Sequence, residues 1–256
     1  MDLIGGEKMS SLPTGIPGLD ELLGGGFPEN RVILVIGGPG AGKTIFASQF
    51  LYKGILDYGE NGIFISLDET KEHLFSEMIK FSWDFNKAAE EGKFAFIDAT
   101  LMSRRTPLME KMYTGNDNLK RKQLPIDKLI EQLEDKIHEI GAKRVVLDTL
   151  ATLFLRFPDK IERRIAIVDL IEALSEMNIT TIITTELEST ALVRKLTLEE
   201  YMVHGVILME KLFSEGSTVR ALQIDKMRTA KINENKVPYT IDKDGIEIYP
   251  DVKLFK

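Results

Sequence analysis

From Arg31 onward, short apolar runs alternate with longer amphipathic stretches along the chain. The apolar runs are rich in β-branched residues and nearly continuous, which is typical of strands buried on both faces. They span Val32–Ile36, Ile63–Leu67, Phe94–Ile97, Val145–Leu147, Thr181–Thr184, Val206–Met209 and Ala221–Ile224. Because strands that alternate with helices form parallel sheets covered on both sides, this pattern predicts an α/β fold with a mostly parallel central sheet.

The longer stretches predict helices at Lys43–Tyr58, Lys71–Phe81, Asp127–Ile140 and Lys160–Met177. In the last helix, apolar residues recur every three or four positions, at Ile161, Ile165, Val168, Ile171 and Leu174. This spacing predicts one buried stripe that packs in the core and does not form a cofactor site.

The C-terminal part of the chain has the pattern of a β-hairpin. Tyr239–Ile241 and Ile246–Tyr249 are predicted to be its two strands, and Gly245 between them suits the positive φ of a turn. We expect the hairpin to close one edge of the sheet. Met102–Pro125 and Glu188–Thr197 show no regular periodicity and are predicted to be functional loops, and residues 1–11 a flexible N-terminus.

Composition narrows the class of protein. The 256 residues are 43% hydrophobic and 29% charged, which suits a single α/β domain over residues 1–256. A net charge of −7 argues against a broad nucleic-acid surface, and the lack of cysteine excludes disulfides and thiolate metal sites. The chain shows neither a basic leader nor an apolar run of about 20 residues, so we expect a cytoplasmic protein that does not span a membrane.

The histidines do not indicate a metal site. His73, His138 and His204 are far apart and none has a second histidine three or four residues away. We expect them to be surface or capping residues.

The segment Gly37–Thr44 fits the phosphate-loop pattern G-x-x-x-x-G-K-[ST] and stands between a predicted strand and a predicted helix. Its glycines let backbone N–H groups turn toward phosphate, and the helix N-terminus favours the same anion. The sequence therefore predicts ATP or ADP binding with Mg²⁺. Lys43 is expected to reach the β- and γ-phosphates and the Thr44 hydroxyl to bind the metal ion. The predicted nucleotide contacts are Gly38, Pro39, Gly40, Ala41, Gly42, Lys43, Thr44 and Ile45.

Acidic residues follow two of the predicted strands. Asp148 ends the run before it, at the edge where open α/β sheets bind ligands, and is predicted to be a second Mg²⁺ ligand. Asp68 and Glu69 follow another strand, and Glu69 is the preferred residue to orient or deprotonate the attacking water. The alternative is that one of this pair only caps the helix that begins near Thr70.

A pair of cations follows the run Ala221–Ile224. Lys226 and Arg228 are two residues apart, so in extended chain their side chains leave the same face. Cations near a γ-phosphate stabilise the transition state and can come from a neighbouring subunit. By spacing alone, a solvated strand end fits this pair equally well.

Taken in order, these motifs resemble the KaiC-like branch of the RecA/RadA superfamily of ATPases, over roughly Leu12 to Pro250. The specific matches are Leu12–Asp20, Gly25-Gly26, Phe81–Asp84, Glu200-Tyr201 through Ile207, and Lys226-Met227-Arg228. The resemblance implies a RecA-like P-loop fold in a single-domain, archaeal-type cytoplasmic ATPase that assembles into a ring, usually a hexamer, with ATP between subunits.

The resemblance also assigns roles to individual residues. It implies that Lys226 and Arg228 act on ATP bound to the next subunit, that Glu69 with Asp68 is the catalytic carboxylate, and that Thr185-Glu186 senses the γ-phosphate. Clock function does not carry over, because the clock protein has two such domains. We expect no autokinase activity at Ser189 or Thr190, although that region carries phosphosites in the relative.

The chain departs from the family pattern at several positions. Asp68-Glu69 replaces a frequent pair of glutamates, and Thr229-Ala230-Lys231-Ile232 replaces a Gly-Thr-like step and a histidine. Lys243 stands where the hairpin has an acidic residue. The sequence thus predicts phosphate recognition more strongly than adenine or ribose recognition.

Three functions remain open at this stage. The leading one is a ring-forming regulatory ATPase that changes its affinity for a protein partner. The second is a recombinase paralogue that binds single-stranded DNA through Arg104-Arg105, Lys120-Arg121-Lys122 and Arg194-Lys195. The third is a nucleotide-gated scaffold with little turnover.

Overall fold

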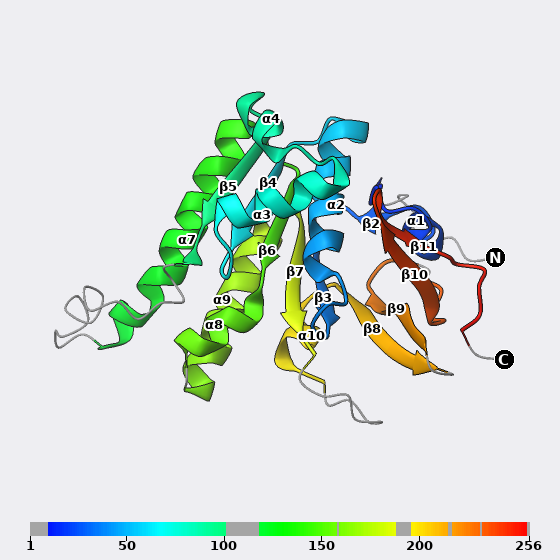
Figure 1. The fold of residues 1–256 in the computed structure, drawn as a ribbon. Helices are drawn as coiled ribbons and strands as arrows, with labels where there is room; N and C mark the ends of the chain where they lie inside the picture. The colour runs from blue at the N-terminus through cyan, green and yellow to red at the C-terminus, as the bar shows by residue number, and fades with distance from the viewer. Residues whose placement is uncertain are drawn as a thin grey trace, which may run out of the picture.

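A nine-stranded sheet forms the centre of the protein in the computed structural model, with strand order β11-β10-β9-β8-β3-β7-β6-β4-β5 (Figure 1). The structure describes residues 10–100, 118–157, 159–187, 196–214, 217–230 and 232–254. A separate two-stranded sheet pairs β1 (Ser11–Leu12) with β2 (Phe27–Pro28).

The predicted mixed α/β architecture is confirmed, with a parallel half and an antiparallel half. The parallel strands are β3 (Val32–Gly37), β4 (Gly62–Ser66), β5 (Phe94–Asp98), β6 (Arg144–Asp148), β7 (Thr180–Glu186) and β8 (Gly205–Ser214). Antiparallel pairing then continues through β9 (Ser217–Met227), β10 (Val237–Asp242) and β11 (Gly245–Ile248). The hairpin β10–β11 lies at the sheet edge as expected, and Gly245 has φ of +111° at its turn.

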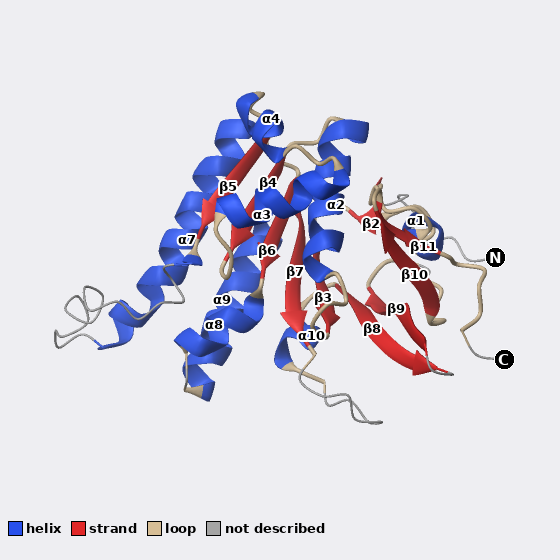
Figure 2. Ribbon diagram, viewed as in Figure 1, coloured by secondary structure: helices blue, strands red, loops and turns tan. Residues whose placement is uncertain are grey.

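Helices pack on the two faces of the sheet, and β3 contributes to both apolar layers by the alternation of its side chains. Ile33 and Val35 join one core with α2 (Lys43–Tyr58), α3 (Lys71–Met78) and α4 (Phe85–Glu90). Leu34 and Ile36 join the other, with α7 (Asn118–Ile140), α8 (Leu150–Arg156) and α9 (Lys160–Glu176). Figure 2 shows these helices in blue around the red strands. The shorter helices are α1 (Leu19–Leu22), the 3₁₀ turn η1 (Ile79–Phe81) and α10 (Leu198–Met202).

The predicted stripe on α9 is wrong in its first half. Ile161 and Ile165 are 71% and 44% exposed, whereas the buried face consists of Ala166, Ile167, Leu170, Ile171 and Leu174. Most steps of the predicted stripe are three residues long, and each falls about 60° short of a full turn at 3.6 residues per turn. The stripe therefore winds around the helix, and only its last members face the core.

The predicted loop Met102–Pro125 is also partly wrong, because α7 already begins at Asn118. The rest of that segment, from 102 to 117, lies outside the described residues. None of the described helices is both long and apolar enough to cross a membrane.

Candidate active site

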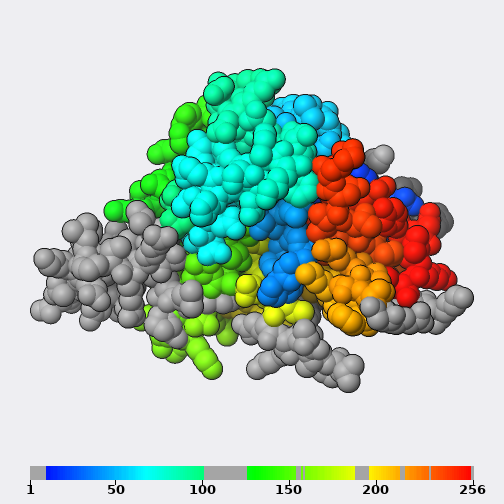
Figure 3. Space-filling model, viewed as in Figure 1, coloured from blue at the N-terminus to red at the C-terminus, as the bar shows by residue number. Residues whose placement is uncertain are grey.

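The predicted phosphate loop joins the end of β3 to the start of α2. Gly37, the last residue of β3, pairs with Glu186 of β7 and Met209 of β8. Gly40 and Gly42 have φ of +70° and +97°, and α2 begins at Lys43 without a side-chain cap. The first N–H groups of α2 are thus left for an external acceptor. Figure 3 shows the blue atoms of this part of the chain at the surface, beside the orange atoms of β8 and β9.

Lys43 folds back over this loop. Its Nζ donates to the carbonyl oxygens of Gly37 at 2.8 Å and Gly38 at 3.4 Å. Burial lowers the pKa of the Lys43 ammonium, and the charges of Glu186 and Asp148 act in the opposite direction. The arrangement keeps a partly desolvated cation at the mouth of the loop.

Thr44 and Asp148 meet at the carboxyl ends of β3 and β6. Thr44 Oγ1 donates to Asp148 Oδ2 at 2.7 Å, and the Thr184 hydroxyl of β7 donates to Asp148 Oδ1. Burial raises the pKa of the Asp148 carboxyl, against these two hydrogen bonds and the charge of Lys43. Thr184 was not predicted from the sequence, although its place at the end of the neighbouring strand could have indicated it.

The donor set fits a magnesium ion. A hydroxyl and a carboxylate are hard oxygen donors, and Mg²⁺ binds few protein ligands because it keeps water and substrate phosphates in its shell. The described residues contain no group of three or more His, Cys, Asp or Glu side chains arranged to hold a metal ion. The Thr44–Asp148 pair, beside the loop, is therefore suited to hold an ion bound together with a nucleotide.

Glu69 lies just beyond β4 with a carboxylate that is only partly satisfied. Its Oε2 is buried without a hydrogen-bond partner among the described residues. Burial raises the pKa of the Glu69 carboxyl, and the negative charges of Glu77, Asp148 and Asp68 raise it further. Thr70 is the N-cap of α3, so the capping alternative does not describe Glu69 or the exposed Asp68.

Thr185 and Glu186 end β7 beside the same loop. Thr185 is buried, and Glu186 is exposed next to Gly37. Ile45 lies in the first turn of α2 and packs against the core. The structure thus brings together at one sheet edge the predicted site residues that it describes, except Lys226 and Arg228.

Lys226 and Arg228 lie at the opposite end of the sheet. The Arg228 N–H donates to the His204 carbonyl at 2.8 Å, and the His204 N–H donates to the Val32 carbonyl at 2.9 Å. Arg228 is therefore level with the first residue of β3, whereas the phosphate loop follows the last of its six residues. At about 3.3 Å per residue the separation along the strand is roughly 17 Å.

Both cations face the C-terminal end of α10, so they do leave the same face. Lys226 Nζ donates to the carbonyls of Val203 at 2.6 Å, Glu200 at 2.9 Å and Tyr201 at 3.2 Å. Arg228 Nη2 lies 3.5 Å from the Tyr201 carbonyl, which is long for a hydrogen bond. Burial, followed by the charge of Arg228, lowers the pKa of Lys226.

Two further residues touch the loop and were missed by sequence reasoning. A Cβ atom built on Gly40 would lie 2.5 Å from Lys211 Nζ on β8, so this ammonium packs on the loop. The Tyr239 hydroxyl on β10 donates to the Ala41 carbonyl at 2.5 Å. Neither residue belongs to a motif, and each is far from the loop in sequence.

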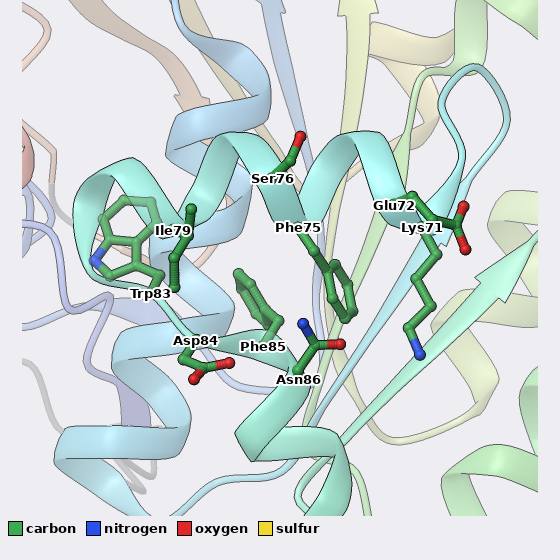
Figure 4. A pocket seen from close by; sticks show the side chains of 9 residues that line it. All are labelled: Lys71, Glu72, Phe75, Ser76, Ile79, Trp83, Asp84, Phe85 and Asn86. Atoms are coloured by element: carbon green, nitrogen blue, oxygen red, sulfur yellow. The ribbon is translucent and has the colours of Figure 1, made fainter.

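A pocket of about 410 Å³ lies between α3 and α4, and none of its lining residues belongs to the predicted site. Figure 4 shows the rings of Phe75 and Phe85 side by side between these helices, with Lys71 and Asp84 at opposite ends. Four other predictions, Ser189, Thr190, Arg104-Arg105 and Arg194-Lys195, lie outside the described residues. Lys120-Arg121-Lys122 falls within α7 instead of a loop.

A mostly parallel sheet with a glycine-rich loop after β3 and acidic residues at the ends of β4 and β6 defines the class of RecA-type P-loop ATPases. The chain belongs to the KaiC family: the family described as "ATPase: KaiC" matches residues 12–253. The predicted resemblance is thereby confirmed.

Relatives and a solved structure agree with this membership. A UPF0273 protein of Methanocaldococcus jannaschii is 36% identical over 96% of this chain and 99% of its own length. A circadian clock protein, KaiC3 of Synechocystis, is 33% identical over 95% of this chain but only 46% of its own length. The crystal structure of the KaiC-like protein PH0186 from Pyrococcus horikoshii has a TM-score of 0.79 and 34% identity, with 94% of this chain and 100% of that chain covered.

Proposed function

We propose that this chain hydrolyses ATP at sites shared between neighbouring copies in a ring. One observation carries the proposal: the phosphate loop with Glu69 and Asp148 lies at one end of the sheet, and Lys226 and Arg228 lie at the other. An Arg228 side chain cannot span the roughly 17 Å to its own loop. A second copy of the chain can place the end of its sheet that carries Arg228 against that loop.

On one side of the shared site, the backbone N–H groups of Gly38–Thr44 and the ammonium of Lys43 bind the phosphates. Thr44 Oγ1 and the Asp148 carboxylate would hold Mg²⁺. When bound, the ion neutralises charge on the β- and γ-phosphate oxygens. Glu186 lies near Lys43 and is suited to report whether a γ-phosphate is present.

Glu69 orients the attacking water and accepts its proton as the water oxygen bonds to the γ-phosphorus and the bond to the β-γ bridging oxygen breaks. Its raised pKa makes it a stronger base than an ordinary carboxylate. Its buried Oε2 has no hydrogen-bond partner among the described residues. Asp68 keeps the site negative and contributes to that raised pKa.

The neighbouring copy supplies the cation that stabilises charge in the transition state. Arg228 is the better candidate because its contact with the Tyr201 carbonyl is long. Lys226 donates to three backbone carbonyls at the C-terminal end of α10. Its role is to hold α10 against the end of β9, just before Arg228. The net charge of −7 favours a protein partner for the ring over nucleic acid.

A complementation assay tests the shared site. Glu69→Gln and Arg228→Ala are each expected to lose ATPase turnover, and a mixture of the two is expected to regain part of it. In mixed assemblies, some sites join an intact Glu69 to an intact Arg228. Lys93→Ala, which removes an exposed cation ahead of β5, is the matched control and is expected to turn over normally.

Other outcomes would contradict the proposal in distinct ways. If Arg228→Ala turned over normally, the contribution in trans would be wrong. Equal turnover for the unmodified chain and Glu69→Gln would favour a nucleotide-gated scaffold. Native mass measurements with and without ATP and Mg²⁺ give the assembly state, and a strict monomer in both would exclude a shared site.

A further inference from the structure

The C-terminal hairpin contacts the phosphate loop directly. Tyr239 of β10 is 3% exposed, and its hydroxyl donates to the Ala41 carbonyl at 2.5 Å. A Cβ atom built on Gly42 would lie 2.6 Å from Ile241 Cδ1, so the same strand packs on the next residue of the loop. Ala41 itself is 1% exposed.

The position of the Ala41 carbonyl determines the direction of a phosphate-binding N–H group. The Ala41–Gly42 peptide is planar and trans, so its C=O and N–H point in opposite directions. With the carbonyl turned toward Tyr239, the Gly42 N–H points away from the hairpin. Gly42 is the N-cap of α2, where N–H groups have no partner within the helix.

The hairpin that carries Tyr239 is fixed to α2. Gln49 on α2 donates to the Ile246 carbonyl at 3.0 Å and accepts the Ile246 N–H at 2.6 Å. Trp83 packs on the turn, because a Cβ atom on Gly245 would lie 2.7 Å from its ring. Tyr239 is therefore held on a rigid support relative to the loop.

Burial also keeps the Tyr239 hydroxyl protonated, since it raises the pKa of this phenol. A buried hydroxyl without a partner is costly, and so is a buried carbonyl without one. The pair satisfies both groups. A phenylalanine at this position would keep the packing and lose only the hydrogen bond.

We propose that Tyr239 is a positioning residue of the phosphate loop, whose hydroxyl holds the Ala41–Gly42 peptide with the Gly42 N–H turned toward bound phosphate. This inference rests on the proposed nucleotide site and assigns the C-terminal hairpin a part in setting its affinity. Tyr239 does not touch the nucleotide and acts only through the backbone of the loop.

Equilibrium binding of ATP with Mg²⁺ to the full chain and to Tyr239→Phe tests the proposal. The dissociation constant is expected to rise about five- to tenfold, because the variant loses one hydrogen bond that orders the loop. Competition by inorganic tripolyphosphate is expected to weaken by the same factor, because the effect lies at the phosphates. Tyr249→Phe, in the same hairpin with its hydroxyl near Thr240 and Glu247, is expected to bind as the unmodified chain does.

The single tryptophan reports whether the hairpin stays in place. Unchanged Trp83 emission in Tyr239→Phe, together with weaker binding, supports a positioning role. Unchanged affinity in this variant would overturn the inference alone, whereas a parent chain that binds no nucleotide would overturn the proposed function as well. Red-shifted emission, or an equal loss of affinity in Tyr249→Phe, would show that the hydroxyl supports the fold and not the loop specifically.

Discussion

Two charged groups at opposite ends of the sheet, the buried Arg144 and the half-buried Glu69, differ in how many hydrogen-bond partners they have. Arg144 begins β6 with a side chain that is 0% exposed and bonds the Glu60 carboxylate at 2.7 Å, the Pro13 carbonyl at 2.8 Å and the Phe50 carbonyl at 2.9 Å. Its guanidinium also stacks over the Phe50 ring at 4.6 Å. Glu69, after β4, has a buried oxygen with no described partner.

The contrast separates a structural charge from a chemically available one. Burial lowers the pKa of Arg144, but Glu60 opposes that change with a hydrogen bond and an opposite charge. Around Glu69 the nearest charges are mostly negative and add to the effect of burial. A charge with all its partners present holds elements together, whereas one left short of partners has a perturbed pKa suited to proton transfer.

The largest expected effect is on stability. Arg144→Ala leaves the Glu60 carboxylate and two backbone carbonyls without their donor, and is expected to lower the free energy of unfolding by about 3–5 kcal/mol. Chemical denaturation measures this directly. Lys136→Ala breaks an exposed ion pair with Glu139 and is expected to cost less than about 1 kcal/mol. A similar cost in both variants would show that the Arg144 cluster is no stronger than a surface pair.

Glu69→Gln should move activity and stability in opposite directions. Turnover is expected to fall at least about a hundredfold, because the base is lost. The folded pKa of Glu69 is raised above the unfolded value of about 4.3. Between the two pKa values the folded state binds more protons, so Glu69 lowers stability as pH rises through that window. The variant should therefore unfold at a higher temperature than the parent at pH 8, with the difference vanishing toward pH 4.

Glu77→Gln tests whether the pKa of Glu69 controls how turnover depends on pH. Glu77 is exposed on α3 and raises the pKa of Glu69 through its charge. Its removal is expected to shift the acidic limb of turnover to lower pH and to lower the rate at pH 8 slightly, because Glu69 becomes a weaker base. An acidic limb that stayed in place would mean that a group other than Glu69 controls it.

The smallest expected effect concerns Lys211, an exposed cation of β8 that packs on the phosphate loop. Lys211→Ala is expected to weaken ATP binding by about two- to fivefold, with a smaller difference at high salt because surface charges are screened. Titrations at two salt concentrations measure this. Lys236→Ala removes a cation that pairs with Glu210, the neighbour of Lys211 on β8, and should bind normally. Equal ATP affinities for Lys211→Ala and the parent would show that Lys211 packs on Gly40 without its charge contributing to phosphate binding.

Much of the fold, and the position of the predicted phosphate loop in it, could be predicted because their signals are local. The helix at Lys43–Tyr58 has the predicted bounds, and Gly37–Thr44 lies between strand and helix as its spacing requires. The predicted stripe on α9 was wrong in its first half because its three-residue steps wind around the helix, so that Ile161 and Ile165 lie away from the buried face. Packing against β3, α7 and α10 decides which face is buried.

The sequence by itself determined the order along the chain of the strands in the large sheet and of its four longest helices, the position of the phosphate loop, and the acids at the ends of β4 and β6, because each depends on residues adjacent in the chain. Only the tertiary structure decided that Thr184 bonds Asp148, that Tyr239 bonds Ala41 and that Arg228 lies far from its own loop. The Tyr239 contact joins residues 198 positions apart. Such contacts depend on strand order and on the antiparallel return of β9, for which a single sequence carries no local signal.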